Sequence, residues 1–160
     1  MSFRSTVLND PEVLDFGRVI KDKLNCILAY DLFQSGIQAG RFCFFNTISN
    51  DVRTGNPGTY SYVGVLVKKT TGEPASLNTI YKPVYTAGSG SQVDSVAEVC
   101  CFGYVVAEIP TAVTPVVGGP VYVDALGRAT TDTAQMVVDA QFVERVTDVS
   151  WVVKLKTIFI

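Results

Sequence analysis

Apolar and polar residues alternate with a period of two along several short stretches of the chain, and this pattern predicts β-strands rather than helices. Residues 62–68 place three valines on one face and end in a charged turn. Residues 149–160 place Trp151 on an apolar face, with lysines on the opposite face. Residues 99–108 are almost entirely apolar, so they predict a strand that crosses the core and is buried on both faces.

The turn residues between these stretches predict how some of the strands are connected. Residues 120–131 carry Gly127 between two short β-prone runs, which predicts a hairpin whose glycine adopts a positive φ. Residues 27–33 and 41–46 flank a glycine-containing turn, so we expect them to pair with each other. Residues 50–58 are rich in Asn, Gly and Pro and are predicted to be a loop.

Composition supports an all-β fold in a single domain. The chain has 160 residues, of which Val, Ile and Thr make up 48 and aromatic residues 17, and all of these types suit a pleated, half-buried surface. Residues 1–25 differ, because charges are scattered through them and their apolar spacing is irregular. We therefore expect an extended N-terminal arm over residues 1–25 and one β domain over residues 26–160, which would stay folded without residues 1–20.

Charge and the absence of histidine exclude several function classes. Without imidazole, the chain has no Ser-His or Cys-His pair and no histidine-liganded metal site. Thirteen Lys and Arg against fifteen Asp and Glu leave no positive excess for nucleic acid. The longest apolar run, residues 109–123, is interrupted by Pro and Gly and predicts no membrane span. With no apolar signal peptide in the first 24 residues, we expect the protein to be made and kept in the cytosol.

Isolated chemical groups in the sequence have simpler structural interpretations. The four cysteines match no metal or redox spacing and are expected to be free and buried, with a Cys26–Cys43 disulfide as the alternative. Glu98 and Glu108 are separated by a whole strand, so they are expected to be solvated charges at the strand ends. Acidic residues near the hairpin do not have the spacing of a calcium loop. The sequence thus predicts no catalytic, cofactor-binding or metal-binding residue and a protein that is not an enzyme.

Both ends of the chain carry features that favour assembly with other chains. The N-terminal arm is of mixed polarity, and the C-terminus is apolar enough to be an aggregation risk unless it is covered. The residues predicted to contact partner chains are Phe3, Arg4, Val7, Leu8, Phe16, Ile158 and Phe159.

Three stretches in the second half of the chain follow one another in a distinctive order. They are a glycine pair followed by the strand PVYVD and a Gly-containing turn (residues 118–130), residues 138–142, which end in Phe, and the valine-rich residues 151–155. In this order they resemble the structural cement proteins that decorate the heads of tailed bacteriophages. A weaker resemblance extends upstream to residues 37–42 and 62–67. The resemblance as a whole implies a β-sandwich or jelly-roll-like barrel as the body of the protein.

The same resemblance implies a function in the virion. The protein would bind the outer surface of the expanded major capsid protein shell, tie neighbouring capsomers together and associate with itself as a dimer or trimer. It would need no cofactor, nucleic acid or membrane, and would assemble in the bacterial cytoplasm. Two other classes stay open: a head-tail joining or tail component, and a lectin-like module that stacks sugars on Tyr60, Tyr62, Tyr81 or Tyr85.

Overall fold

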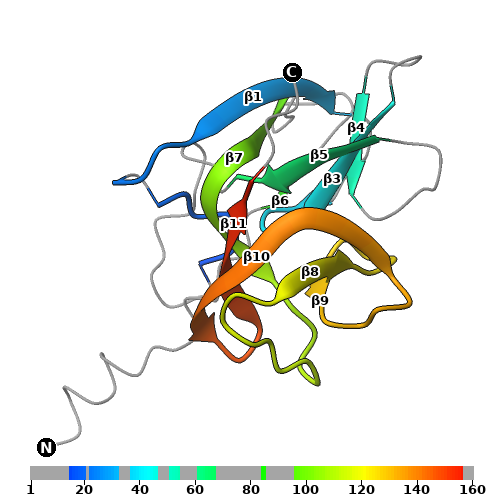
Figure 1. The fold of residues 1–160 in the computed structure, drawn as a ribbon. Coiled ribbons are helices and arrows are strands. Elements are labelled where there is room, and N and C mark those ends of the chain that lie inside the picture. Colours follow the sequence, from blue (N-terminus) through cyan, green and yellow to red (C-terminus); the bar gives the residue numbers. More distant parts are fainter. Residues whose placement is uncertain are drawn as a thin grey trace, which may run out of the picture.

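The computed structural model describes residues 15–20, 22–32, 37–46, 51–54, 61–67, 84–85 and 96–156, which are largely β-structure (Figure 1). The all-β prediction is confirmed. No helix in this described part of the chain is long and apolar enough to span a bilayer. The strands are β1 (Cys26–Leu32), β2 (Ile37–Gln38), β3 (Phe42–Asn46), β4 (Asp51–Thr54), β5 (Ser61–Leu66), β6 (Val84–Tyr85), β7 (Val96–Glu108), β8 (Pro120–Val123), β9 (Ala129–Thr130), β10 (Met136–Thr147) and β11 (Ser150–Leu155).

Nine of these strands form one continuous curled sheet in the order β1-β4-β3-β5-β7-β11-β10-β8-β9. Because β1 also pairs with β7, the first five strands of that order close into a ring, whereas the other four extend from β7 (Figure 1). Most pairs are antiparallel, and β1 with β4 is parallel. The described residues thus form a curled sheet that resembles the predicted barrel in its ring, and β2 and β6 pair with each other in a separate two-stranded sheet.

Strand β7 belongs to both parts of the sheet because it is 13 residues long. Its first half lies between β1 and β5, since Cys100 pairs with both Ile27 and Val65. Its second half pairs with β11, where Val105 lies opposite Val153. Apolar side chains on both faces of this strand are buried, as the sequence predicted.

Two apolar clusters follow from this arrangement. The smaller cluster takes side chains from all five strands of the ring and therefore fills it. The larger cluster lies between the outer wall of the ring and strands β8–β11, with Phe42 and Phe44 from β3 and Phe142 and Trp151 from β10 and β11. The burial predicted for Trp151 is confirmed, and this cluster fixes the surface that carries the candidate site.

The predicted hairpin is confirmed. Strands β8 and β9 pair through Tyr122 and Thr130, and Gly127 in the turn has a φ of 87°. The Asp124 carboxylate accepts hydrogen bonds from the backbone N–H groups of Leu126 and Arg128, both at 2.9 Å, so the turn itself accounts for this acid.

Two predictions about the first half of the chain are wrong. Strands β1 and β3 do not pair with each other, because β4 lies between them and pairs with both. Strand β4 itself lies within residues 50–58, which were predicted to be a loop. The turn-rich composition of that stretch concealed a four-residue strand whose Val52 is fully buried.

The segment 15–20 packs against the sheet instead of leaving it. Val19 forms an isolated antiparallel bridge with Val105 of β7. Gly17 N–H donates to the Val106 carbonyl at 2.8 Å, and Val106 N–H donates to the Arg18 carbonyl at 2.9 Å. A domain that began at residue 26 would lose these contacts. Residues 1–14 lie outside the described residues, so an arm formed by them stays a prediction.

Replacing Phe16 by alanine tests whether this segment belongs to the folded body. Phe16 is 2% exposed, so its truncation is expected to lower the free energy of unfolding by about 3 kcal/mol. Urea unfolding measures the loss. Arg18→Ala is the control, because this side chain is exposed and its surface ion pair with Asp15 contributes at most about 1 kcal/mol. If both variants were as stable as the wild type, the segment would not contribute to the folded body and would behave as a detached arm.

Candidate interaction surface

The β7–β8 loop, residues 109–119, is an uncharged surface segment held firmly to the sheet. Ile109 N–H donates to the Val149 carbonyl at 2.8 Å at its start. At its end, Gly118 N–H donates to the Phe142 carbonyl at 2.7 Å, and Phe142 N–H donates back to the Gly119 carbonyl at 3.0 Å. Because both ends are fixed to strands or turns of the sheet, the loop presents its side chains in a defined position.

Two neighbouring valines at the end of this loop point into solvent. Val116 is 71% exposed and Val117 is 69% exposed, and we call the two together the valine tip. A single exposed apolar side chain is ordinary, but two adjacent ones on a fixed, uncharged loop form a surface that gains free energy when a partner covers it. The valine tip is therefore a candidate contact with another chain.

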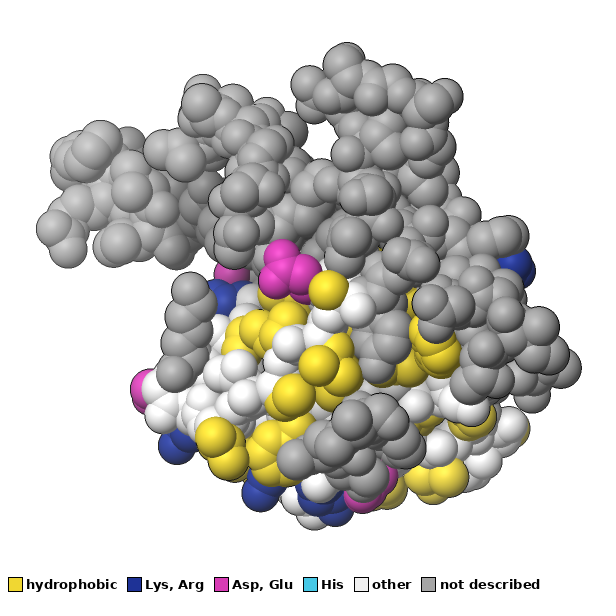
Figure 2. Space-filling model, turned by 90° about the horizontal axis from the view of Figure 1, so that it is seen from above, with side chains coloured by type: hydrophobic (Ala, Val, Ile, Leu, Met, Phe, Trp, Pro, Cys, Tyr) yellow, Lys and Arg dark blue, Asp and Glu magenta, His cyan; other side chains and the backbone are white. Residues whose placement is uncertain are grey.

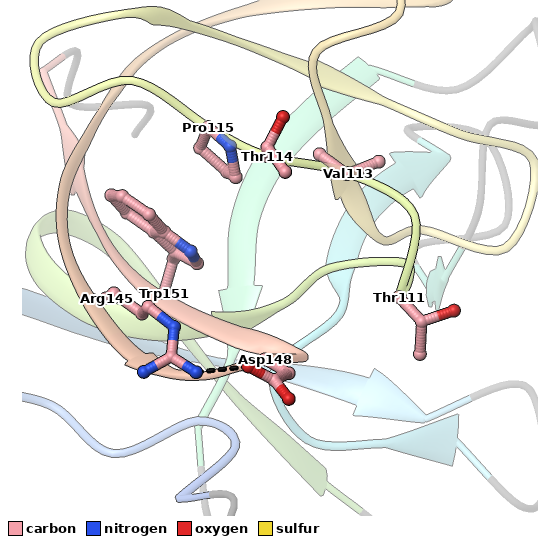
Figure 3. A pocket seen from close by; sticks show the side chains of 7 residues that line it. All are labelled: Thr111, Val113, Thr114, Pro115, Arg145, Asp148 and Trp151. Carbon is pink, nitrogen blue, oxygen red and sulfur yellow. Dashed lines mark hydrogen bonds and ion pairs between the residues drawn. The ribbon is translucent and has the colours of Figure 1, made fainter.

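A pocket of about 330 Å³ opens beneath the same loop (Figure 3). Trp151 lies on one side of it, facing Pro115 of the loop, and the ion pair between Arg145 and Asp148 lies at its edge. Trp151 is 8% exposed and packs edge-on against Phe142, with ring centroids 5.8 Å apart. The residues that line the pocket are Thr111, Val113, Thr114, Pro115, Arg145, Asp148 and Trp151.

This pocket offers a recess for an apolar side chain. The Arg145 guanidinium and the Asp148 carboxylate in its lining form an ion pair with each other, and its two hydroxyl groups belong to threonines of the loop. Among the described residues, no group of three or more Cys, Asp or Glu side chains is placed to hold a metal ion. Binding through shape and apolar contact is what this surface can provide.

The cysteines act as core side chains. All four are free, and Cys43, Cys100 and Cys101 are buried. Burial raises the pKa of Cys100 to about 12 and that of Cys43 well above its usual value, so both stay protonated and unreactive near neutral pH. The prediction of free cysteines is confirmed, and their predicted burial holds for Cys43, Cys100 and Cys101 but not for the half-buried Cys26. The alternative Cys26–Cys43 disulfide is wrong.

Glu108 corrects another prediction. Glu98 is exposed, as expected for a strand-end charge, but Glu108 is almost buried. Its Oε1 accepts hydrogen bonds from Arg41 Nε at 3.0 Å and Gln38 Nε2 at 2.8 Å, and its backbone N–H donates to the Gly40 carbonyl. The carboxylate therefore joins the end of β7 to the β2–β3 turn and is occupied by that structural role.

The interface residues predicted from the sequence are not assembled into one surface by the described residues. Phe16 is buried within its own chain, so it is not free to contact a partner. The other six lie outside the described residues and stay predictions: Phe3, Arg4, Val7, Leu8, Ile158 and Phe159.

The valine tip was missed at the sequence level. The uncharged run of residues 109–123 was used to exclude a membrane span, although the same absence of charge is a mark of a contact surface. On the face seen from above, hydrophobic side chains lie together across the visible described surface, and charged groups lie mainly towards its margin (Figure 2).

Comparison with known proteins decides the family. No protein-family model matches the chain, and neither does any curated protein. A chain in the solved structure described as "The capsid of Myoviridae Phage XM1" is 30% identical, with a TM-score of 0.79 over 99% of this chain and 100% of that chain. The chain therefore belongs to a family of phage capsid proteins.

This likeness covers nearly all of this chain, including its second half, on which the resemblance to cement proteins rests. At this identity and coverage the two chains share one fold. The predicted structural role in a phage and the location in the virion are supported at this level, and a non-enzymatic role agrees with them.

Proposed function

We propose that this capsid protein is a structural cement protein of a tailed-phage head. It binds the outer surface of the major capsid protein shell and stabilises the expanded capsid. The observation that carries the proposal is the full-length likeness to a chain of a phage capsid structure. The resemblance of residues 118–130, 138–142 and 151–155 to cement proteins makes the assignment more specific.

The surface of the protein suits this role. The valine tip lies on the uncharged β7–β8 loop and provides an exposed apolar contact. The pocket beneath that loop adds a recess, which Trp151 and the Arg145–Asp148 ion pair also line. One such contact is small, but a shell repeats its binding positions many times, and an oligomer that engages several positions at once gains affinity through effective concentration. Self-association as a dimer or trimer is part of the proposal for this reason.

Co-sedimentation with phage heads that lack the protein tests the proposal. We expect saturable binding to expanded heads and none to unexpanded procapsids, because the proposed role is to stabilise the expanded state. Failure to bind expanded heads would refute the cement function while leaving the capsid family unchanged.

A double substitution of the valine tip tests which surface is used. Val116→Ser/Val117→Ser is expected to change the free energy of unfolding by less than about 0.5 kcal/mol, because both side chains are exposed. Its binding to expanded heads is expected to be at least about tenfold weaker, in line with the loss of a buried apolar contact. Val137→Ser is the matched control, since this exposed valine lies on β10 outside the loop. Equal losses in both variants would contradict a specific role of the tip.

A further inference from the structure

A second surface, on the outer side of β7 and β11, carries an unusual group of positive charges. Lys154 of β11 lies opposite Tyr104 of β7 in the strand register, and its Nζ is 5.7 Å from the centre of the tyrosine ring. Lys23, from the segment before β1, places its Nζ 5.8 Å from the centre of the same ring. Two ammonium groups thus converge on one aromatic side chain.

These two charges are not neutralised within the described chain. Neither Lys23 nor Lys154 has a carboxylate partner among the residues that the structure describes, whereas Arg18, Arg41, Arg128, Arg145 and Lys156 each have one. The next lysine along the chain, Lys156, has its Nζ 3.9 Å from Asp139 Oδ1. Two positive charges near one ring raise the local positive potential, so an anionic group that approaches this surface is attracted.

The lysines are held in place by the backbone around them. Ile20 N–H donates to the Tyr104 carbonyl at 2.9 Å, and Lys23 N–H donates to the Ile20 carbonyl at 3.3 Å. The chain then crosses directly over Gly103: a Cβ at that position would lie 2.6 Å from the Leu24 carbonyl oxygen. Lys23 is therefore carried on a segment fixed to β7, and not on a free tail.

An apolar group accompanies the charges. Leu24 follows Lys23 directly and is 80% exposed, which makes it the most exposed large hydrophobic side chain of the described residues. The surface combines two cations, one aromatic ring and one leucine. Such a mixture matches an acidic protein segment that carries an apolar side chain better than it matches a nucleic-acid backbone. The net charge of -2 also gives no general attraction for phosphates.

We infer that the surface formed by Lys23, Leu24, Tyr104 and Lys154 docks an acidic segment of a shell protein, whose carboxylates face the two ammonium groups. The inference rests on the proposed cement function. It adds an electrostatic contact to the apolar contact of the valine tip, and it fixes a second point of attachment that orients the protein on the shell.

Charge reversal at the two lysines tests the inference in the full-length protein. Wild-type binding to expanded heads that lack the protein is expected to weaken as salt is raised, because salt screens exposed charge pairs. Lys23→Glu/Lys154→Glu is expected to bind at least about tenfold more weakly at low salt. The matched control is Lys23→Arg/Lys154→Arg, which keeps both charges and the ring contacts and is expected to bind like the wild type.

The possible results separate this inference from the function on which it rests. If the wild type binds and the charge-reversed variant binds equally well, the docking surface is refuted and the cement function stands. If the wild type binds no heads, the cement function fails and the surface has no shell partner. If the protein binds a duplex DNA fragment through these lysines and does not bind heads, the inferred protein partner is wrong and the surface binds nucleic acid. The single variant Lys23→Glu, outside the strands, replaces the double variant if the latter unfolds.

Discussion

Gly64→Ala is expected to destabilise the protein by about 3 kcal/mol or more, because a methyl group at this position has no space. A Cβ on Gly64 would lie 2.0 Å from the Cys100 carbonyl oxygen and 3.1 Å from the Cys101 Cα, and both are backbone atoms of β7. Strand β7 cannot yield easily, since it is paired with β1 on one edge and with β5 on the other. Urea unfolding followed by the fluorescence of Trp151, the one tryptophan of the chain, measures the loss.

Gly118→Ala is the control for this substitution. Gly118 has a φ of 83° and no heavy atom within 4 Å of an added Cβ, so alanine there meets strain in the backbone but no clash. Its expected cost is about 1 kcal/mol. A Gly64→Ala protein as stable as the control would show that β5 and β7 do not approach each other so closely.

Trp151→Ala is expected to cost about 3 to 5 kcal/mol of unfolding free energy, because the side chain is almost buried and fills the space between Phe142 and the β7–β8 loop. Its removal would also enlarge the pocket under the loop. Circular dichroism is the suitable probe, since the substitution removes the tryptophan fluorescence.

Trp151→Phe separates the contribution of packing from that of the indole. Phenylalanine keeps an edge-on contact with Phe142 and fills most of the volume, so its expected cost is about 1 to 2 kcal/mol. An unchanged unfolding midpoint in Trp151→Ala would place the side chain at a site that contributes little to the core. That result would also show that the indole ring does not help to position the β7–β8 loop and the valine tip.

Local sequence patterns predicted the second half of the fold well. The hairpin of β8 and β9 has a glycine that tolerates positive φ between two β-prone runs, and β7 is long, apolar and buried on both faces. These features are set by residues close in sequence, so they can be derived from alternation and turn chemistry.

Pairings between distant residues escaped prediction. Strand β4 consists of Asp51–Thr54 within a stretch of turn-favouring residues, and it is a strand because β1 and β3 both supply hydrogen-bond partners. Glu108 is buried because Gln38 and Arg41, about 70 residues earlier in the chain, complete its hydrogen bonds. Neither strand β4 nor the burial of Glu108 is indicated by the neighbouring residues in the sequence, since both depend on how the sheet closes.

The candidate surfaces were only partly accessible from the sequence. The uncharged loop was visible, but exposure of Val116 and Val117 follows from the hydrogen bonds that tie Gly118 and Gly119 to Phe142. The convergence of Lys23 and Lys154 on Tyr104 requires the register of β7 with β11 and the path of residues 20–24. Surfaces made from separate segments become visible only once the strands are paired.

Whether the protein binds the outside of the shell can be seen in a cryo-electron microscopy difference map between heads with and without it. We expect additional density on the outer surface of expanded heads, repeated at equivalent positions of the shell and of a size that fits 17.3 kDa subunits. Density restricted to the vertex that joins head and tail, or on the inner surface of the shell, would contradict this expectation.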